Sequence, residues 1–297
     1  MRRRRLHESV ASVLLATSIA GGAAADASST ADCQNDAVAA GTVCLDRYEA
    51  SVWRVPDPTT RNAGLVARIR LGIANRGDLT AGGASLLGDR DDDYAPCQDD
   101  GRGCGDLFAV SIPSVPPSAF ATWFQAQEAC GNSGKRLPTN AEWQIGADGT
   151  PDPGPDDGIS DCNTASRESA TLTGERAACR SARGAFDMVG NVEEWVAEWM
   201  PMSTDCPGWA RFSDDAMCLA GAGTAKANPG ALLRGGGFSD GPLAGPLCID
   251  GSVEPTRSDA SIGFRCARAL PEPALAAQVA SGVAALGLLA RMRRRSR

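Results

Sequence analysis

The cysteines constrain this chain of 297 residues more than any other feature. There are eleven of them, spread from Cys33 to Cys266, and no pair has the Cys-x-x-Cys spacing of a zinc knuckle or a thioredoxin-type motif. In an exported protein most should form disulfides, and an odd number leaves at least one free, modified or bonded to another chain. With 34 glycines and 18 prolines, the chain is expected to form a loop-rich, disulfide-stapled domain.

The first 25 residues have the order of a secretory signal peptide. Four arginines over residues 2–5 precede an apolar stretch over 10–20, and small residues at 23–25 suit cleavage. An amphipathic helix kept in the mature chain is the alternative. We therefore expect export, with residues 26–42 as a linker ahead of the folded domain. Removal of the signal would also remove His7, the only histidine, and would exclude histidine-dependent hydrolysis and histidine-bound zinc or iron.

The other end, residues 270–297, has three parts in order. Pro271-Glu272-Pro273 precedes a mostly apolar stretch over 274–290, and an arginine cluster follows. As a helix the apolar stretch would reach roughly 25 Å, which makes it a short candidate for spanning a bilayer core of roughly 30 Å. The positive-inside rule would keep the arginines cytoplasmic and the main domain outside. The order resembles the PEP-CTERM sorting signal, which implies an exosortase-type processing enzyme as a partner; a plain membrane anchor is the alternative.

The charge distribution limits the other partners. Both ends carry arginine clusters, so the chain between them is more acidic than the formal net charge of −7 suggests. Such a surface repels phosphate backbones and attracts divalent cations or basic surfaces, so no nucleic-acid partner is expected. Membrane contact is expected only through the C-terminal segment, which would anchor the protein transiently at the cell surface before release.

Local patterns predict short elements separated by long loops. Residues 43–53 are expected to form a strand, and residues 54–117 an irregular insertion. The Asp-x-Asp-x-Asp spacing within 89–93 is similar to a calcium loop, but Tyr94 stands where such a loop needs glycine, so a solvated acidic loop is preferred.

Capping boxes predict the start of two helices, one at Thr122 with Gln125 and one at Thr139 with Glu142. Further strand-like segments lie at 192–199, 231–234 and 262–269. Because there is no repeat and no alternating strand-helix pattern, we expect an α+β fold with a large irregular fraction.

Four segments occur in a recognisable order: GKRLPTNAEW from Gly134, DMVGNVEEW from Asp187, RGGGF from Arg234 and GFRC from Gly263. Together with CLDRYE from Cys44, they resemble the sulfatase-modifying-factor family, whose founding activity is the formylglycine-generating enzyme. The resemblance spans residues 43–269. It implies a C-type-lectin-like, irregular, disulfide-stapled α+β single domain.

The resemblance also implies a reaction, the oxidation of a sulfatase cysteine to formylglycine by oxygen and a Cu(I) ion. Two thiolates in a Cys-x4-Cys segment would hold the ion, since thiolates select Cu(I) over harder ions. Here Asp240 and Gly245 stand at the matching positions. A carboxylate and a bare glycine cannot supply two thiolates, so we assign no catalytic residue and expect no bound copper. Cys248 matches a third, structural cysteine of the family.

Other cysteines bear on the same question. Cys206 and Cys218 could approach Cys248 and rebuild a metal site, although a disulfide between the first two is preferred. The family resemblance implies a disulfide between Cys130 and Cys266, which would close a loop of more than a hundred residues and contribute about 5 kcal/mol. A histidine-dependent branch of the family, the ergothioneine-type sulfoxide synthases, is excluded once the N-terminus is removed.

Structural calcium is a further implication of the family resemblance. Oxygen ligands from a tight loop are what Ca²⁺ requires. The matching ligands are the carboxylates of Asp187 and Glu194 and the carbonyls of Gly190 and Val192. A solvated turn ahead of a core strand is the alternative. A second family calcium site would begin at Asn163, without an identifiable later carboxylate.

The remaining large side chains are expected to be structural. Trp143, Trp195 and Trp199 are interpreted as core residues. Arg136 and Arg265 are expected to pair with core carboxylates.

Two main hypotheses for function remain: a non-catalytic domain that binds a protein or glycan, and an oxidase with a displaced cysteine site. A structural subunit cross-linked through the odd cysteine is a third.

Overall fold

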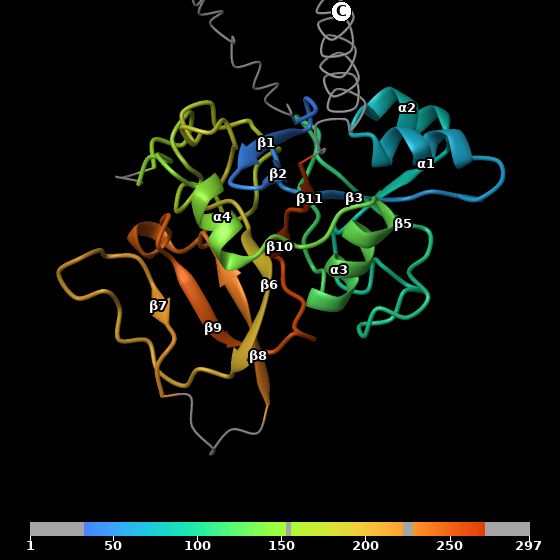
Figure 1. Ribbon diagram of the computed structural model, residues 1–297. Helices are drawn as coiled ribbons and strands as arrows, with labels where there is room; N and C mark the ends of the chain where they lie inside the picture. The colour runs from blue at the N-terminus through green and yellow to red at the C-terminus, as the bar shows by residue number, and fades with distance from the viewer. Residues whose placement is uncertain (1–32, 153–155, 222–227, 271–297) are drawn as a thin grey trace, which may run out of the picture. The chain divides into compact units, whose positions relative to one another are not determined.

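The computed structural model describes residues 33–152, 156–221 and 228–270 (Figure 1). The predicted signal peptide and the predicted sorting signal from residue 271 onward lie outside these ranges. No helix within the described residues is long and apolar enough to cross a membrane.

The described strands form three small sheets. Figure 1 shows these strands, coloured by position in the chain from blue near the N-terminus to red near the C-terminus. In the first sheet the order is β1 (Ala37–Ala40), β2 (Val43–Asp46) and β11 (Ala267–Ala269). In the second it is β10 (Ile262–Phe264), β6 (Glu193–Pro201), β8 (Pro229–Arg234), β9 (Ile249–Val253) and β7 (Met217–Cys218). In the third it is β4 (Ser85–Leu87), β3 (Ser51–Arg54) and β5 (Leu107–Val110). The first and last strands of the described chain thus share one sheet.

The described helices are short: α1 (Ala63–Arg70), α2 (Arg76–Ala81), α3 (Trp123–Asn132), α4 (Asn140–Gly146) and the 3-10 turn η1 (Gly241–Leu243). Both predicted capping boxes are present. Thr122 accepts from the Gln125 amide while the Gln125 side chain accepts from Thr122, and Thr139 and Glu142 do the same. These reciprocal bonds satisfy amides that a helix start leaves unpaired. The first amides of the two helices, of Trp123 and Asn140, donate to Pro255 and Glu198 in distant segments.

The prediction that residues 54–117 are irregular is wrong. This range contains α1, α2, β4 and β5, and the two strands flank β3 in an antiparallel sheet. Trp53 and Phe108 from that sheet pack with Leu65 and Ile69 of α1 in one hydrophobic cluster. The elements are three to eight residues long, and partners distant in the sequence hold them, so no sustained periodicity marks them.

Two segment predictions also need correction. Part of the expected linker, residues 37–40, forms β1 and pairs with β2. The strand expected over 43–53 is two strands, β2 and β3, that belong to different sheets. The segment 262–269 divides likewise into β10 and β11, because β10 pairs with β6 and β11 pairs with β2 in a different sheet.

Five disulfides join ten of the eleven cysteines: Cys33–Cys44, Cys97–Cys104, Cys130–Cys266, Cys162–Cys179 and Cys206–Cys218. The structure thus contains the pairing implied for Cys130 and Cys266, which ties α3 to the segment between β10 and β11. Cys206 and Cys218 bond to each other, as preferred. The eleventh cysteine, Cys248, is free and buried.

The core surrounds two fully buried tryptophans, as expected. Trp195 packs in a cluster with Phe264 and the Cys130–Cys266 disulfide, and Trp143 packs in another with Leu45 and Met188. Trp199 does not follow the prediction, because 43% of it is exposed. It lies near the end of β6, where its ring makes edge contacts with the rings of α3.

Candidate functional site

The loop after β8 carries Asp240 and Gly245, the residues that the motif resemblance matches to the family's copper-binding cysteines, and Arg234 lies at its start. The buried guanidinium of Arg234 donates to the carbonyl of Cys248 at 2.5 Å and to that of Pro246 at 3.1 Å. It also lies 4.5 Å from the centre of the Trp143 ring, a cation–π contact. Burial lowers the pKa of Arg234 to about 10, so it stays charged at neutral pH. The two ends of the loop are therefore held together by one side chain.

Asp240, at the first of the two matching positions, is used within its own loop. Its carboxylate accepts a hydrogen bond of 2.7 Å from the amide of Gly237. It stands immediately before η1, and the Leu243 amide donates to the Asp240 carbonyl at 3.1 Å. Asp240 therefore shapes the turn, and its oxygen donors are poor ligands for a soft ion such as Cu(I).

Gly245, at the second position, faces the carboxylate of Asp215. A Cβ atom at Gly245 would lie 2.0 Å from Asp215 Oδ1, closer than real atoms approach. The other oxygen, Oδ2, accepts from the Leu247 amide at 2.6 Å, which fixes the carboxylate there. The space that a side chain at residue 245 would need is therefore filled by Asp215. These residues do not fit a bis-thiolate copper site.

Cys248 supplies the one thiol among the described cysteines. Only 4% of it is exposed, and burial raises the pKa of the thiol well above its usual range. The nearby negative charges of Glu193 and Asp240 raise this pKa further. Cys248 is thus a neutral thiol at physiological pH, whereas metal binding and nucleophilic attack require a thiolate.

Glu193 is a candidate functional residue that the sequence analysis missed. Successive side chains of a strand point to opposite faces, so Glu193 and Glu194 at the start of β6 have different environments. Glu194 is buried, whereas Glu193 lines an open pocket of about 710 Å³ together with Glu254, Arg257 and Asp259. Burial, followed by the charges of nearby aspartates, raises the pKa of Glu193 to about 8. The alternation of side chains between the two faces of the predicted strand could have identified Glu193 from the sequence.

The expected calcium ligand Glu194 is engaged with an arginine instead. Its Oε1 accepts from Arg265 Nη2 at 2.5 Å, and its Oε2 accepts from Arg265 Nε at 2.6 Å and from Trp143 Nε1 at 2.7 Å. Arg265 thus pairs with a core carboxylate, as expected, whereas Arg136 pairs with Glu142 near the surface. Both oxygens of Glu194 are occupied, so in this arrangement it does not fit a calcium ligand.

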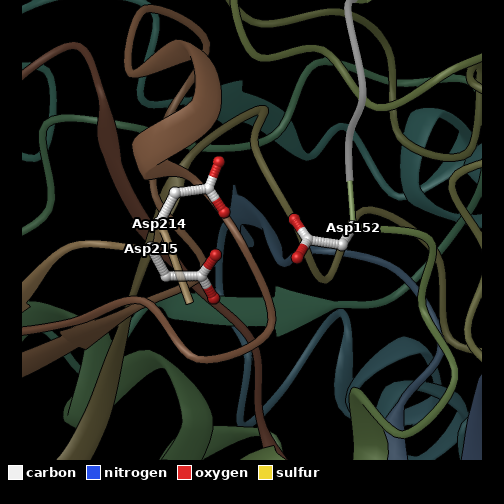
Figure 2. A group of neighbouring side chains, drawn as sticks. All are labelled: Asp152, Asp214 and Asp215. Carbon is white, nitrogen blue, oxygen red and sulfur yellow. The ribbon is translucent and has the colours of Figure 1, made fainter. Parts of the chain in front are cut away.

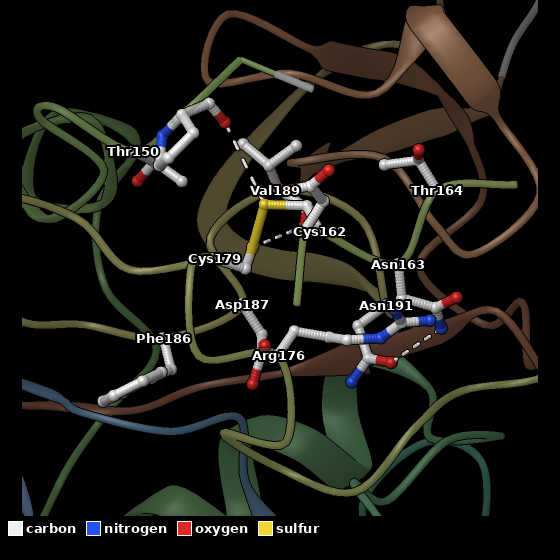
Figure 3. Close-up of a disulfide and its surroundings, with 12 residues drawn as sticks. Thr150, Cys162, Asn163, Thr164, Arg176, Cys179, Phe186, Asp187, Val189 and Asn191 are labelled. Atoms are coloured by element: carbon white, nitrogen blue, oxygen red, sulfur yellow. Dashed lines mark hydrogen bonds between the residues drawn. A yellow bond between two sulfur atoms is a disulfide. The ribbon is translucent and has the colours of Figure 1, made fainter. Parts of the chain in front are cut away.

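The loop that carries Asp187 is held from several sides (Figure 3). Asp187 is buried at a positive φ of 57°, and its Oδ2 accepts from the Gly174 amide at 2.7 Å. Burial raises the pKa of Asp187 to about 7. The Cys162–Cys179 disulfide lies beside it, and the Cys179 carbonyl accepts from the Asp187 amide at 3.0 Å.

Two residues near this loop were assigned no firm role from the sequence. Glu49, from the opening motif, accepts from the Asn191 side chain at 2.6 Å and from the Val192 amide at 3.1 Å, so it anchors the loop. Asn163 donates to Asn191 at 3.1 Å, and its buried Oδ1 has no partner among the described residues. The Gly190 amide donates to Gly235, which connects this loop to the one after β8.

Residues 97–270 match the family model described as the sulfatase-modifying factor enzyme 1-like domain. The chain belongs to this family. The C-type-lectin-like, disulfide-stapled α+β fold expected for the family is therefore its fold class. The matched segment contains α3, α4, the four motifs that begin at residues 134, 187, 234 and 263, and all the site residues above except Glu49.

Solved structures with a similar fold include the P3c variant of the Major Tropism Determinant, PvdO from Pseudomonas aeruginosa, and CarF. The P3c variant is 22% identical, with 50% of this chain and 38% of that chain covered and a TM-score of 0.35. PvdO is 20% identical, with coverage of 77% and 80% and a TM-score of 0.42. CarF is 18% identical, with coverage of 76% and 86% and a TM-score of 0.38. The chain thus spans just over a third of the length of the P3c variant. A comparison of this chain with curated proteins found no match.

Proposed function

We propose that this member of the sulfatase-modifying-factor family is a non-catalytic domain that binds a protein or glycan outside the cell. The observation that carries the proposal is the state of the cysteines. Cys248 is the one free thiol and is buried, while the other ten are bonded in pairs. A Cu(I) centre of the family type needs two thiolates at one place, and Asp240 and Gly245 stand at the matching positions.

The cysteine pairing also supports the proposed compartment. Disulfides persist in oxidising surroundings, as outside the cytoplasm. Together with the signal-like N-terminus and the PEP-CTERM-like C-terminus, this supports export, transient anchoring and processing by an exosortase-type enzyme. Cell-surface or extracellular localisation follows as part of the proposal.

The pocket beside Glu193 is the binding surface that we propose. It adjoins the loop of Asp240, since a Cβ at Gly237 would lie 3.6 Å from the Glu193 side chain. Three carboxylates and one guanidinium line it, and that guanidinium, from Arg257, is already paired with Asp259 at 2.5 Å. With a pKa of about 8, Glu193 is mostly protonated at neutral pH, so Glu254 carries the remaining negative charge. This charge, the Glu193 carboxyl group and the hydroxyl groups of Ser252 and Ser261 suit a ligand with cationic and hydroxyl groups.

Peptide and glycan arrays probed with the purified chain test this proposal. We expect retention of a ligand class that is enriched in basic or hydroxyl groups, and at least tenfold weaker binding by the Glu193→Ala and Glu254→Gln variants. Glu128→Gln removes an exposed carboxylate on α3 that does not line the pocket, and should leave binding unchanged. An empty result on both arrays, or equal loss in all three variants, would count against the proposal.

The alternative is a formylglycine-generating oxidase with a displaced cysteine site. One observation favours it: the free thiol of Cys248 lies in the same loop as the family's copper position. This alternative predicts that a cysteine peptide is converted to formylglycine and that Cys248→Ser abolishes the conversion. The non-catalytic proposal predicts no conversion by either protein.

A further inference from the structure

Three aspartates outside the family's site share one place in the structure. Asp152 lies in the loop that follows α4, and Asp214 and Asp215 lie in the loop that precedes β7. Each offers a carboxylate oxygen, and these oxygens lie within 4.8 Å of one another. Figure 2 shows the Asp152 carboxylate facing those of Asp214 and Asp215. We propose that these three side chains bind a divalent cation, with Ca²⁺ as the ion that suits them best.

The state of Asp215 is the second observation that points to a ligand. Only 1% of this residue is exposed, and its Oδ1 has no hydrogen-bond partner among the described residues. A buried carboxylate oxygen without a partner is costly, because it has given up water without compensation. In the described part of the chain, no lysine or arginine forms an ion pair with any of the three aspartates. The charge of buried Arg234 acts on Asp215 from beyond ion-pair distance. A bound cation would place a positive charge in direct contact with all three carboxylates.

The chemistry of the cluster selects the class of ion. Carboxylate oxygens are hard donors, and two ligands of one Ca²⁺ ion at 2.3–2.6 Å can stand about 5 Å apart, which fits the observed spacing. Asp152 and Asp214 are exposed, so water can complete the coordination shell. Three carboxylates in a partly open site resemble weak extracellular calcium modules, with dissociation constants on the order of 0.1–1 mM.

The position of the site gives the cation a structural effect. Asp215 holds the Leu247 amide through its other oxygen, and it lies against Gly245. A cation at the cluster would therefore link the loop after α4 and the loop before β7 to the segment that replaces the copper site. Hard oxygen donors would then stabilise the region whose positions match the family's two thiolates.

Calorimetric titration of the purified chain with CaCl₂ tests the proposal. Asp152→Asn and Asp214→Asn are the informative variants, because both side chains are exposed and their loss should not prevent folding. Each should weaken one calcium-binding event at least tenfold. Asp92→Asn, which removes an exposed carboxylate from the acidic run, is the matched control and should bind as the wild type does.

Asp187→Asn separates this site from the calcium position that the family implies. If the proposal holds, this variant keeps the event that Asp152→Asn and Asp214→Asn weaken. The proposal is overturned if both of those variants bind calcium like the wild type. It is also overturned if the wild type binds none at 10-fold excess over the expected constant, or if Asp187→Asn alone removes binding.

Discussion

At the scale of single residues, the two positions that match the family's copper-binding cysteines are engaged by other groups of this chain. Gly245 has no side chain, and the Asp215 carboxylate lies where one would begin. Asp240 bonds to its own turn, and Cys248 is buried as a neutral thiol. Other side chains therefore occupy and use the space around these two positions.

The contact between residue 245 and Asp215 can be tested by adding one methyl group. Gly245→Ala should destabilise the protein by about 1–3 kcal/mol, since the Asp215 carboxylate is buried and held by the Leu247 amide. Urea unfolding measures the change. Gly131→Ala, on α3 with no atom within 4 Å of the added Cβ, should be neutral or stabilising by up to about 1 kcal/mol. An equal cost for Gly245→Ala in an Asp215→Ala background would show that the contact is not responsible.

At the scale of elements, Lys135 ties the connection between α3 and α4 to the first sheet. Its ammonium lies 2.6 Å from Asp46 Oδ1, at the end of β2, and 3.2 Å from Asp36 Oδ2, just before β1. All three side chains are almost fully buried. Arg268 of β11 adds a bond of 3.0 Å to the same oxygen of Asp36, so this charge cluster joins three strands and a loop.

Removal of Lys135 should therefore be severe. Lys135→Met leaves two buried carboxylates without their shared cation and should cost about 3–5 kcal/mol of unfolding free energy, measured by urea denaturation. Its neighbour provides the control. Arg136→Met breaks a pair with Glu142 in which the arginine side chain is 42% exposed, and should cost less than about 1 kcal/mol. Similar costs for the two variants would contradict this account of the cluster.

The same scale shows which elements the sequence can predict. The starts of α3 and α4 were predictable, because the capping bonds of Thr122 and Thr139 form within four residues. A capping box also starts α2, at Asn75 with Asp78, although α2 was missed within a range expected to be irregular. Strands β4 and β5 have no such local signal, since β3 defines them from a distance.

The candidate site was predictable only in part, for the same reason. The RGGGF motif located the loop after β8, and Asp240 and Gly245 could be matched from it to the family's copper-binding cysteines. The approach of Asp215 to Gly245 depends on how a loop without regular structure folds back, and no local pattern encodes that contact. The bonds of Glu194 to Arg265 join segments 71 residues apart. A core carboxylate could therefore be expected for Arg265 without being identified, whereas Glu194 was expected to bind calcium.

At the scale of the whole molecule, disulfides support a fold built from three small sheets and short helices. The Cys130–Cys266 bond spans 136 positions and joins the α3 region to the last strands. The Cys97–Cys104 bond spans only 7 and is local. In the chain-entropy model, the longer loop restricts the unfolded chain more strongly.

Paired alanine substitutions compare the two bonds. Replacing Cys130 and Cys266 should lower the free energy of unfolding by about 5 kcal/mol, and replacing Cys97 and Cys104 by about 2 kcal/mol. All four residues are buried, so the loss of packing is similar in the two variants. Denaturant unfolding checks the order, and a larger loss from the local pair would contradict it.

The central claim, that this family member has the scaffold without the copper chemistry, is tested most directly by one assay. The purified chain is incubated with Cu(I), oxygen, a reductant and a cysteine-containing sulfatase peptide, and the peptide mass is followed beside an active family member. The account predicts no formylglycine and no copper retained against a thiol competitor. Stoichiometric copper together with peptide conversion would contradict it.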